Sequence, residues 1–115
     1  MDQILSELLA RVDGARAAAV GSRDGLLVEQ WPQGGDLAAL VAEQAGLLQA
    51  AGAARHRLGG ELTELILQDA AQVTFLRPIG AQLFLLVLLG LPGNLGQLRW
   101  FAPRAAERLA QLVQL

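Results

Sequence analysis

The stretch Leu83-Phe-Leu-Leu-Val-Leu-Leu-Gly-Leu91 carries no charged and no polar side chain. An amphipathic helix would place a polar residue at every third or fourth position, and a half-exposed strand would alternate polar with apolar residues. We therefore predict that Leu83 to Leu89 is a strand buried on both faces, at the centre of a sheet that helices cover on both sides. The run is far shorter than the ~20 residues of a membrane-spanning helix. It is bounded by turn formers, namely Pro78, Gly80, Gly90, Pro92 and Gly93.

The composition indicates a single domain that is apolar for its size. The chain has 115 residues, of which 53% are hydrophobic and 17% are charged, and its mean hydropathy is +0.38. We expect one domain over residues 1–115, with some of its apolar surface covered by a partner or a second copy. The net charge of −2 gives no broad basic field, so we expect no nucleic-acid partner.

The residue types that are missing exclude several classes of enzyme. The chain has no lysine, which a Walker A loop, a protein kinase and a pyridoxal enzyme all require. It has no cysteine and one histidine, His56, so neither a thiolate or histidine metal site nor a catalytic triad can be built. We expect a non-enzymatic protein without catalytic residues, cofactor or metal. The start of the chain lacks the pattern of a signal peptide, which predicts a cytoplasmic protein with no direct membrane insertion.

The first part of the chain reads as a helix followed by a hairpin. Apolar residues at helical spacing predict a short helix that Asp2 caps and Gly14 ends. Ala15 to Gly21 and Leu26 to Trp31 read as paired strands, because Asp24-Gly25 between them is a strong tight-turn signal.

A long helix is predicted from Leu37 to Arg55, with Asp36 as its cap. Its apolar stripe comprises Leu37, Leu40, Val41, Leu47 and Leu48. A second, flat face consists of small residues, which would let another helix approach closely: Ala39, Ala42, Gly46, Ala50 and Ala53. Alternatively, the alanines are simply good helix formers. The basic residues Arg55, His56 and Arg57 suit the dipole of the helix end, or else form a docking patch for an acidic partner.

The second half predicts a three-stranded meander and a last helix. Leu62 to Gln68 and Val73 to Leu76 read as strands that precede the central one. Glu61 and Glu64 read as solvated or edge charges that point to opposite faces of the first strand and guard an edge against promiscuous pairing. Asn94 is the expected cap of the last helix, and Pro103 should break or kink that helix near Ala102. The order α-β-β-α-β-β-β-α predicts an α/β (α+β) fold. We expect one antiparallel five-stranded sheet, with the first and last helices on one face and the long helix on the other.

Several local patterns, taken together and in this order, resemble the roadblock/dynein light chain family. They include Ser22-Arg23-Asp24-Gly25-Leu26, the Ala-rich helix, Gly60-Glu61-Leu62, Arg77-Pro78-Ile79-Gly80 and Asn94-Leu95-Gly96. The resemblance implies a profilin-like fold and a non-enzymatic protein that dimerises through the long helix and the strand after it, which would add Leu62, Glu64 and Ile66 to the dimer interface. Bacterial members of the Mgl type act on a Ras-like small GTPase, helping it to arrange its own catalytic groups.

The function expected from this resemblance is that of a homodimer which binds and modulates a Ras-like small GTPase across its two long helices. The polar positions expected to face the GTPase are Glu43, Gln44 and Gln49, with Arg55 and Arg57 at the rim. The alternative is a PAS or profilin-like sensory domain that holds a small molecule under a helix. The sequence leaves open which flat side of the long helix the dimer uses, and whether the GTPase is activated or only localised.

Overall fold

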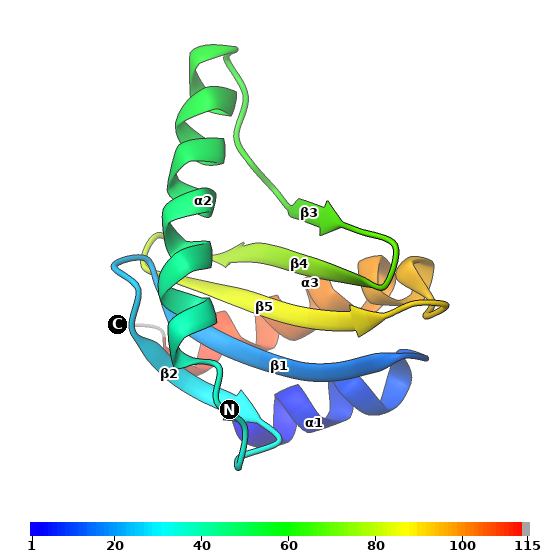
Figure 1. Ribbon diagram of the computed structural model, residues 1–115. Coiled ribbons are helices and arrows are strands. Elements are labelled where there is room, and N and C mark those ends of the chain that lie inside the picture. The colour runs from blue at the N-terminus through cyan, green and yellow to red at the C-terminus, as the bar shows by residue number, and fades with distance from the viewer. Residues whose placement is uncertain (114–115) are drawn as a thin grey trace.

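The computed structural model describes residues 1–113, which form one five-stranded antiparallel sheet and three helices (Figure 1). The elements are α1 (Asp2–Arg11), β1 (Ala15–Ser22), β2 (Leu27–Trp31), α2 (Ala38–Arg57), β3 (Leu65–Gln68), β4 (Gln72–Ile79), β5 (Leu83–Gly90) and α3 (Leu95–Leu112). The strands lie in the order β2-β1-β5-β4-β3. The predicted fold class and the central position of the apolar strand are therefore confirmed.

β5 pairs along its length with β1 on one side and β4 on the other, so it lies at the centre of the sheet, and helices cover both of its faces. Alternate side chains of β5 serve two separate cores. Phe84 and Leu86 pack under α2, whereas Leu85, Val87 and Leu89 pack under α1 and α3. This double burial is the physical reason why the strand has no polar position.

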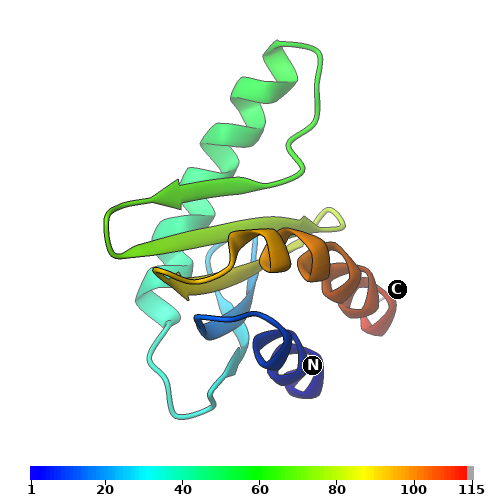
Figure 2. The same cartoon turned by 90° about the vertical axis from the view of Figure 1, so that its right-hand side faces the viewer.

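The helices form two unequal layers, as predicted. α1 and α3 lie side by side on one face of the sheet, and α2 crosses the other face alone (Figure 2). The pair on the first face is joined where the end of α1 meets the start of α3. There the backbone N–H of Asp13 donates to Oε1 of Gln97 at 2.9 Å, and the N–H of Asn94 donates to the carbonyl of Asp13 at 2.8 Å.

Two glycine positions are fixed by close packing or by turn geometry. Gly25 has φ +97° and closes the β1–β2 turn, as the Asp24-Gly25 pair predicted. Gly14 has φ +87°, and a Cβ on it would lie 2.6 Å from Cα of Gly93. Glycine at position 14 therefore lets the turn after α1 press against the turn before α3.

The helix caps were only partly predicted. Asn94 caps α3, because its Oδ1 accepts from the N–H of Gln97 at 2.9 Å. Asp2 lies inside the first turn of α1 and does not cap it. Asp36 does not cap α2 either, because the capping position is Leu37, whose N–H donates to Oε1 of Gln30 at 3.3 Å. α2 therefore begins without a side-chain cap of its first turn.

The strand boundaries differ from the prediction at β3 and β4. β3 begins only at Leu65, so Glu61 and Glu64 do not lie on a strand, and the prediction that they share one was wrong. β4 continues through Pro78 to Ile79, although the sequence predicted its end at Leu76. Proline is tolerated there because β3 pairs with β4 only as far as Leu76, which leaves position 78 on an edge.

α3 continues through Pro103, so the predicted break does not occur, and the predicted alternative of a kink near Ala102 stays a prediction. Proline inside a helix costs about 3 kcal/mol or more, since it removes one hydrogen bond and crowds the preceding turn. Ala102, Ala105 and Ala106 are buried on either side of it. We attribute the continuity of α3 to this tertiary packing, which the helix would lose if it ended at Ala102.

Candidate functional site: the outward face of the long helix

The second half of α2 extends beyond the sheet. The buried residues of α2 are Val41, Gln44, Ala45 and Leu48, and no residue of this fully described helix is buried from position 49 to its end. Figures 1 and 2 show the helix continuing past the β3 edge and the chain returning to β3 through an extended segment. About two turns of helix therefore stand without a sheet beneath them.

Such an overhang is costly for the chain on its own. Short helices without tertiary packing are marginal in water, and each glycine inside a helix costs about 1 kcal/mol relative to alanine. Gly46 and Gly52 are both in α2, yet a Cβ on either would meet no other part of the described chain within 4 Å. By contrast, a Cβ on Gly21 would lie 2.6 Å from Cγ1 of Val41. Nothing within residues 1–113 explains the two helical glycines.

The structure brings together the small residues that the sequence assigned to a dimer interface. All five are exposed, and their spacing places them on the side of α2 that faces away from the sheet: Ala39, Ala42, Gly46, Ala50 and Ala53. We call this set the outward face of α2.

The family resemblance added three residues to the expected dimer interface, and none of them lies on the outward face of α2. Leu62 is half-buried and packs against the core under α2. Ile66 packs against the opposite core, under α1 and α3. Glu64 is also half-buried, and its carboxylate lies 2.7 Å from Nε of Arg99 and 3.9 Å from Nη1 of Arg77. Glu64 therefore links the segment before β3 to α3 by an ion pair, and the reading of Glu64 as a solvated charge was wrong.

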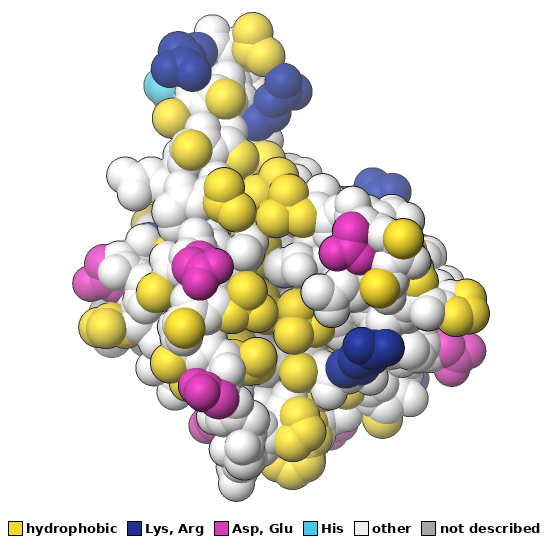
Figure 3. Space-filling view, in the orientation of Figure 1, with side chains coloured by type: hydrophobic (Ala, Val, Ile, Leu, Met, Phe, Trp, Pro, Cys, Tyr) yellow, Lys and Arg dark blue, Asp and Glu magenta, His cyan; other side chains and the backbone are white. Residues whose placement is uncertain are grey.

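Apolar side chains gather beside α2. Leu47, which belongs to the apolar stripe of the predicted helix, is 45% exposed. Position 47 lies about a third of a turn from Val41 around the helix axis, which places it away from the sheet. On the sheet beside it, Leu67 of β3 is exposed and Leu88 of β5 is only partly buried. Figure 3 shows the resulting column of hydrophobic side chains along α2 where the helix crosses the sheet.

β3 supplies an open edge next to this apolar column. Its four residues pair with β4 on one side, and in the described part of the chain no strand pairs with the other side. A free strand edge presents unpaired N–H and C=O groups and is a template for pairing with another chain. The edge lies beneath the overhang of α2, so both features face the same region (Figure 1).

The polar residues predicted to face a partner are mostly exposed, with one error. Glu43, Gln49, Arg55 and Arg57 are exposed on α2. Gln44, however, is only 8% exposed, and its Oε1 has no hydrogen-bond partner within residues 1–113. The prediction for Gln44 was wrong. Gln44 follows Val41 by three residues, which is almost one full turn of the helix, so its side chain points back toward the sheet.

The tip of the overhang is basic. Arg55, His56 and Arg57 end the helix, and the dark blue and cyan side chains at the tip are visible in Figure 3. The N–H of Gly60 donates to the carbonyl of Arg55 at 3.0 Å, which turns the chain back toward β3. Leu58 in this turn is 73% exposed. The tip therefore combines positive charge with an exposed leucine, Leu58, which was not among the predicted site residues.

Residues 1–113 contain neither a metal-binding cluster nor a membrane-spanning helix. No three His, Asp or Glu side chains in this range lie close enough to hold a metal ion together. No helix in the same range is both long enough and apolar enough to cross a bilayer.

Comparisons with known proteins agree with this architecture. The Roadblock/LC7 domain matches residues 1–89. A Roadblock/LC7 domain from Streptomyces avermitilis is 22% identical and superposes with a TM-score of 0.92, covering 100% of this chain and 98% of that one. The gliding protein MglB from Thermus thermophilus is 25% identical, with a TM-score of 0.87 and coverage of 97% and 87%.

A more distant likeness supports the profilin-like description of the fold. Profilin IA from Acanthamoeba castellanii is 14% identical, with a TM-score of 0.64 and coverage of 96% and 94%. No curated protein sequence matches this chain. Because the family match spans most of the chain, this protein belongs to the Roadblock/LC7 domain family.

Proposed function

We propose that this chain is a non-enzymatic homodimer that binds and modulates a Ras-like small GTPase. The observation that carries the dimer is the overhanging half of α2, in which no side chain is buried. The GTPase is supported by membership of the family and by the likeness to MglB, a member of the Mgl-type branch that the sequence resembles.

In the proposed dimer, the α2 helices of two copies pack against each other through the outward face. Small side chains allow the helix axes to approach to the lower end of the usual ~8–10 Å. A close partner backbone at Gly46 would explain a glycine that the chain itself does not require. The open edge of β3 lies in the same region, so a two-fold axis there would also allow the two sheets to pair.

The GTPase would bind across the composite surface of the two helices, at a stoichiometry of one GTPase per dimer. Glu43 and Gln49 remain the proposed central polar contacts, and Arg55 and Arg57 remain the rim. Rim charges act mainly on the association rate and its salt dependence, whereas central contacts act on dissociation. The protein contributes a surface and no catalytic group, so it hydrolyses no GTP alone.

A small-molecule sensory role is not favoured by the packing under α2. Val41, Leu48, Phe84 and Leu86 are fully or almost fully buried between helix and sheet, where a sensory domain would hold its ligand.

The direct test is recovery of a GTPase from extract of the native host, loaded with GTP, followed by kinetics with the purified pair. Arg55→Glu with Arg57→Glu should slow association and leave the dimer intact. Arg11→Glu with Arg104→Glu makes the same change of charge on the opposite face and serves as the control. Recovery of no GTPase would refute the proposal, and equal loss of binding in both double variants would refute the site.

A further inference from the structure

A groove runs between α1 and α3, on the face of the sheet opposite to α2. The two helices leave a hollow of about 310 Å³. Its floor is apolar and includes the buried side chains of Ile4, Leu8 and Ala105 and the half-buried ring of Phe101. Its rim is charged and consists of Glu7, Arg11, Arg104 and Arg108. We call this feature the α1–α3 groove.

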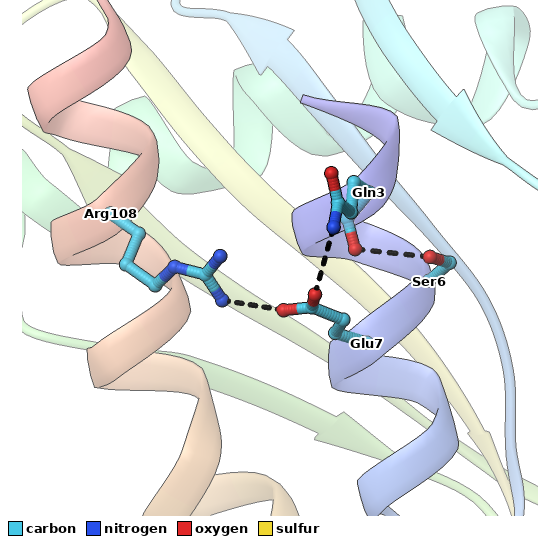
Figure 4. Close-up of polar contacts among 4 residues, drawn as sticks. All are labelled: Gln3, Ser6, Glu7 and Arg108. Carbon is cyan, nitrogen blue, oxygen red and sulfur yellow. Dashed lines mark hydrogen bonds and ion pairs between the residues drawn. The ribbon is translucent and has the colours of Figure 1, made fainter.

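One arginine of the rim is already neutralised. Nη1 of Arg108 donates to Oε2 of Glu7 at 2.7 Å, and Nε2 of Gln3 donates to the other oxygen of the same carboxylate at 3.3 Å (Figure 4). The hydrogen bond and charge of Arg108 lower the pKa of Glu7 below its ordinary value. Glu7 thus stays ionised and bridges the two helices at one end of the groove.

The other two arginines have no such partner. The guanidinium carbon of Arg11 lies 5.5 Å from the centre of the Phe101 ring, and that of Arg104 lies 3.9 Å from the centre of the Trp100 ring. Arg104 also donates to the carbonyl of Trp100 at 2.6 Å. Within residues 1–113, neither guanidinium forms an ion pair with a carboxylate. Both are held against aromatic rings and keep N–H donors for an incoming group.

The rim is therefore positive on a protein that is negative as a whole. It has three arginines against one glutamate, whereas the chain carries a net charge of −2. Trp100, beside the groove, is 60% exposed. Tryptophan and arginine are among the residues most enriched at the energetic centres of protein interfaces. The positive rim and the exposed ring together favour a protein partner with acidic groups.

We propose that the α1–α3 groove binds an acidic, partly apolar peptide segment of a partner protein. Carboxylates of the segment would pair with the planar forks of Arg11 and Arg104. An apolar side chain of the segment would enter the hollow above Ile4 and Ala105. The groove lies on the far side of the sheet from α2, so this partner is separate from the proposed GTPase, and both surfaces can be occupied at once.

An anionic membrane is the competing occupant, and the charge count disfavours it. Lipid-binding patches typically gather about four to eight basic residues. The rim offers three, one of which is bound to Glu7. The concave apolar floor also suits a side chain better than a flat lipid surface.

The experiment is a selection of randomised peptides displayed on phage against the purified full-length chain. The strongest selected peptide is then synthesised with a fluorescein label and titrated by anisotropy. We expect the enriched sequences to combine Asp or Glu with Leu, Phe or Trp. In a Trp31→Phe background, which leaves Trp100 as the sole tryptophan, binding should shift the emission of Trp100 to shorter wavelength.

Matched variants locate the site. Arg11→Glu with Arg104→Glu should raise the Kd of the selected peptide by about tenfold or more, because opposite charges become like charges. Arg55→Glu with Arg57→Glu makes the same charge change at the tip of α2 and should leave the Kd unchanged. All four side chains are exposed, so we expect both variants to fold, which circular dichroism checks.

Three results would overturn the proposal. The first is enrichment of peptides without acidic residues. The second is equal affinity of the selected peptide for wild type and Arg11→Glu/Arg104→Glu. The third is that no acidic peptide is selected, while the chain co-sediments with phosphatidylserine–phosphatidylcholine vesicles and this co-sedimentation requires Arg11 and Arg104. That result would assign the groove to a membrane surface.

Discussion

The two faces of the sheet are built from similar residues but are closed to different degrees. On one face, α1 and α3 lie side by side, are joined by the Arg108–Glu7 ion pair, and cover the larger core. On the other face, α2 crosses alone, presents small residues outward and leaves Leu47 and Leu67 exposed. The difference teaches that one helix cannot cover a five-stranded sheet. Leu47 and Leu67 are left exposed where, in the proposed dimer, a second copy would complete the layer.

The largest expected effect is the loss of unfolding free energy when a core leucine is truncated, and this loss should be similar on the two faces of the sheet. Leu85 and Leu86 are adjacent, fully buried residues of β5 that point to opposite faces. Each change to Ala should cost about 2–5 kcal/mol of unfolding free energy. In urea titrations at several protein concentrations, we expect Leu86→Ala alone to show an additional dependence on concentration, since its core adjoins the proposed dimer. The same concentration dependence for both variants would count against the contrast between the faces.

A charge on the outward face of α2 should separate the copies. Ala50 is exposed in the chain but would be buried in the dimer, and burial of an unpaired charge costs several kcal/mol. Ala50→Arg should therefore weaken the dimer about a hundredfold or more, or ~3 kcal/mol. Ala10→Arg, at an exposed alanine of α1, is the matched control and should leave the mass of the particle unchanged in light scattering. A dimer that tolerates Ala50→Arg as well as Ala10→Arg would place the interface elsewhere.

Gly46→Ala should have opposite effects on the monomer and on the dimer. Alanine favours the helix by about 1 kcal/mol, and its Cβ would meet no other part of the described chain within 4 Å. We expect the monomer to become more stable by that amount, measured at low concentration, while dimerisation weakens because the partner helix is pushed away. Tighter dimerisation would show that no helix packs closely at position 46.

The smallest expected effect concerns pH on the closed face. The pKa of Glu7 is lowered in the folded state by Arg108, so the folded state is stabilised above the ordinary pKa of 4.5 and loses this stabilisation as the pH falls through the lowered value. Because the pair is exposed, the change should be small. Glu7→Gln should flatten the dependence of the urea midpoint on pH below about 5, with little change at neutral pH. An unchanged slope would mean that the ion pair contributes nothing to folding.

The elements that could be predicted from the sequence are those whose cause is local. The apolar run of β5, the Asp24-Gly25 turn and the cap by Asn94 each depend on a few neighbouring residues, and all three are confirmed. The orientation of Gln44 was also predictable, since counting residues around the helix from Val41 would have placed it toward the sheet.

The remaining features depend on contacts between distant segments. The continuity of α3 through Pro103 depends on packing against the sheet. β3 begins later than predicted, and Glu64, just before it, forms an ion pair with Arg99 of α3. The overhang of α2 depends on where the sheet ends, which helical periodicity does not reveal. For the α1–α3 groove, the i, i+4 spacing of Trp100, Arg104 and Arg108 was a usable signal, although none of the three was among the predicted site residues.

Disulfide cross-linking tests most directly whether a second copy covers the outward face of α2. The chain has no cysteine, so Ala39→Cys, Ala50→Cys and Ala53→Cys can be compared one at a time with Ala10→Cys and Gln111→Cys, which lie on α1 and α3. A disulfide forms readily only when the two Cα atoms lie within about 7 Å of each other. We predict rapid oxidation to covalent dimers at one or more of the three α2 positions and slow oxidation at both controls. Equal rates at all five positions, with a mass of 12.2 kDa for the unmodified chain at micromolar concentration, would contradict it.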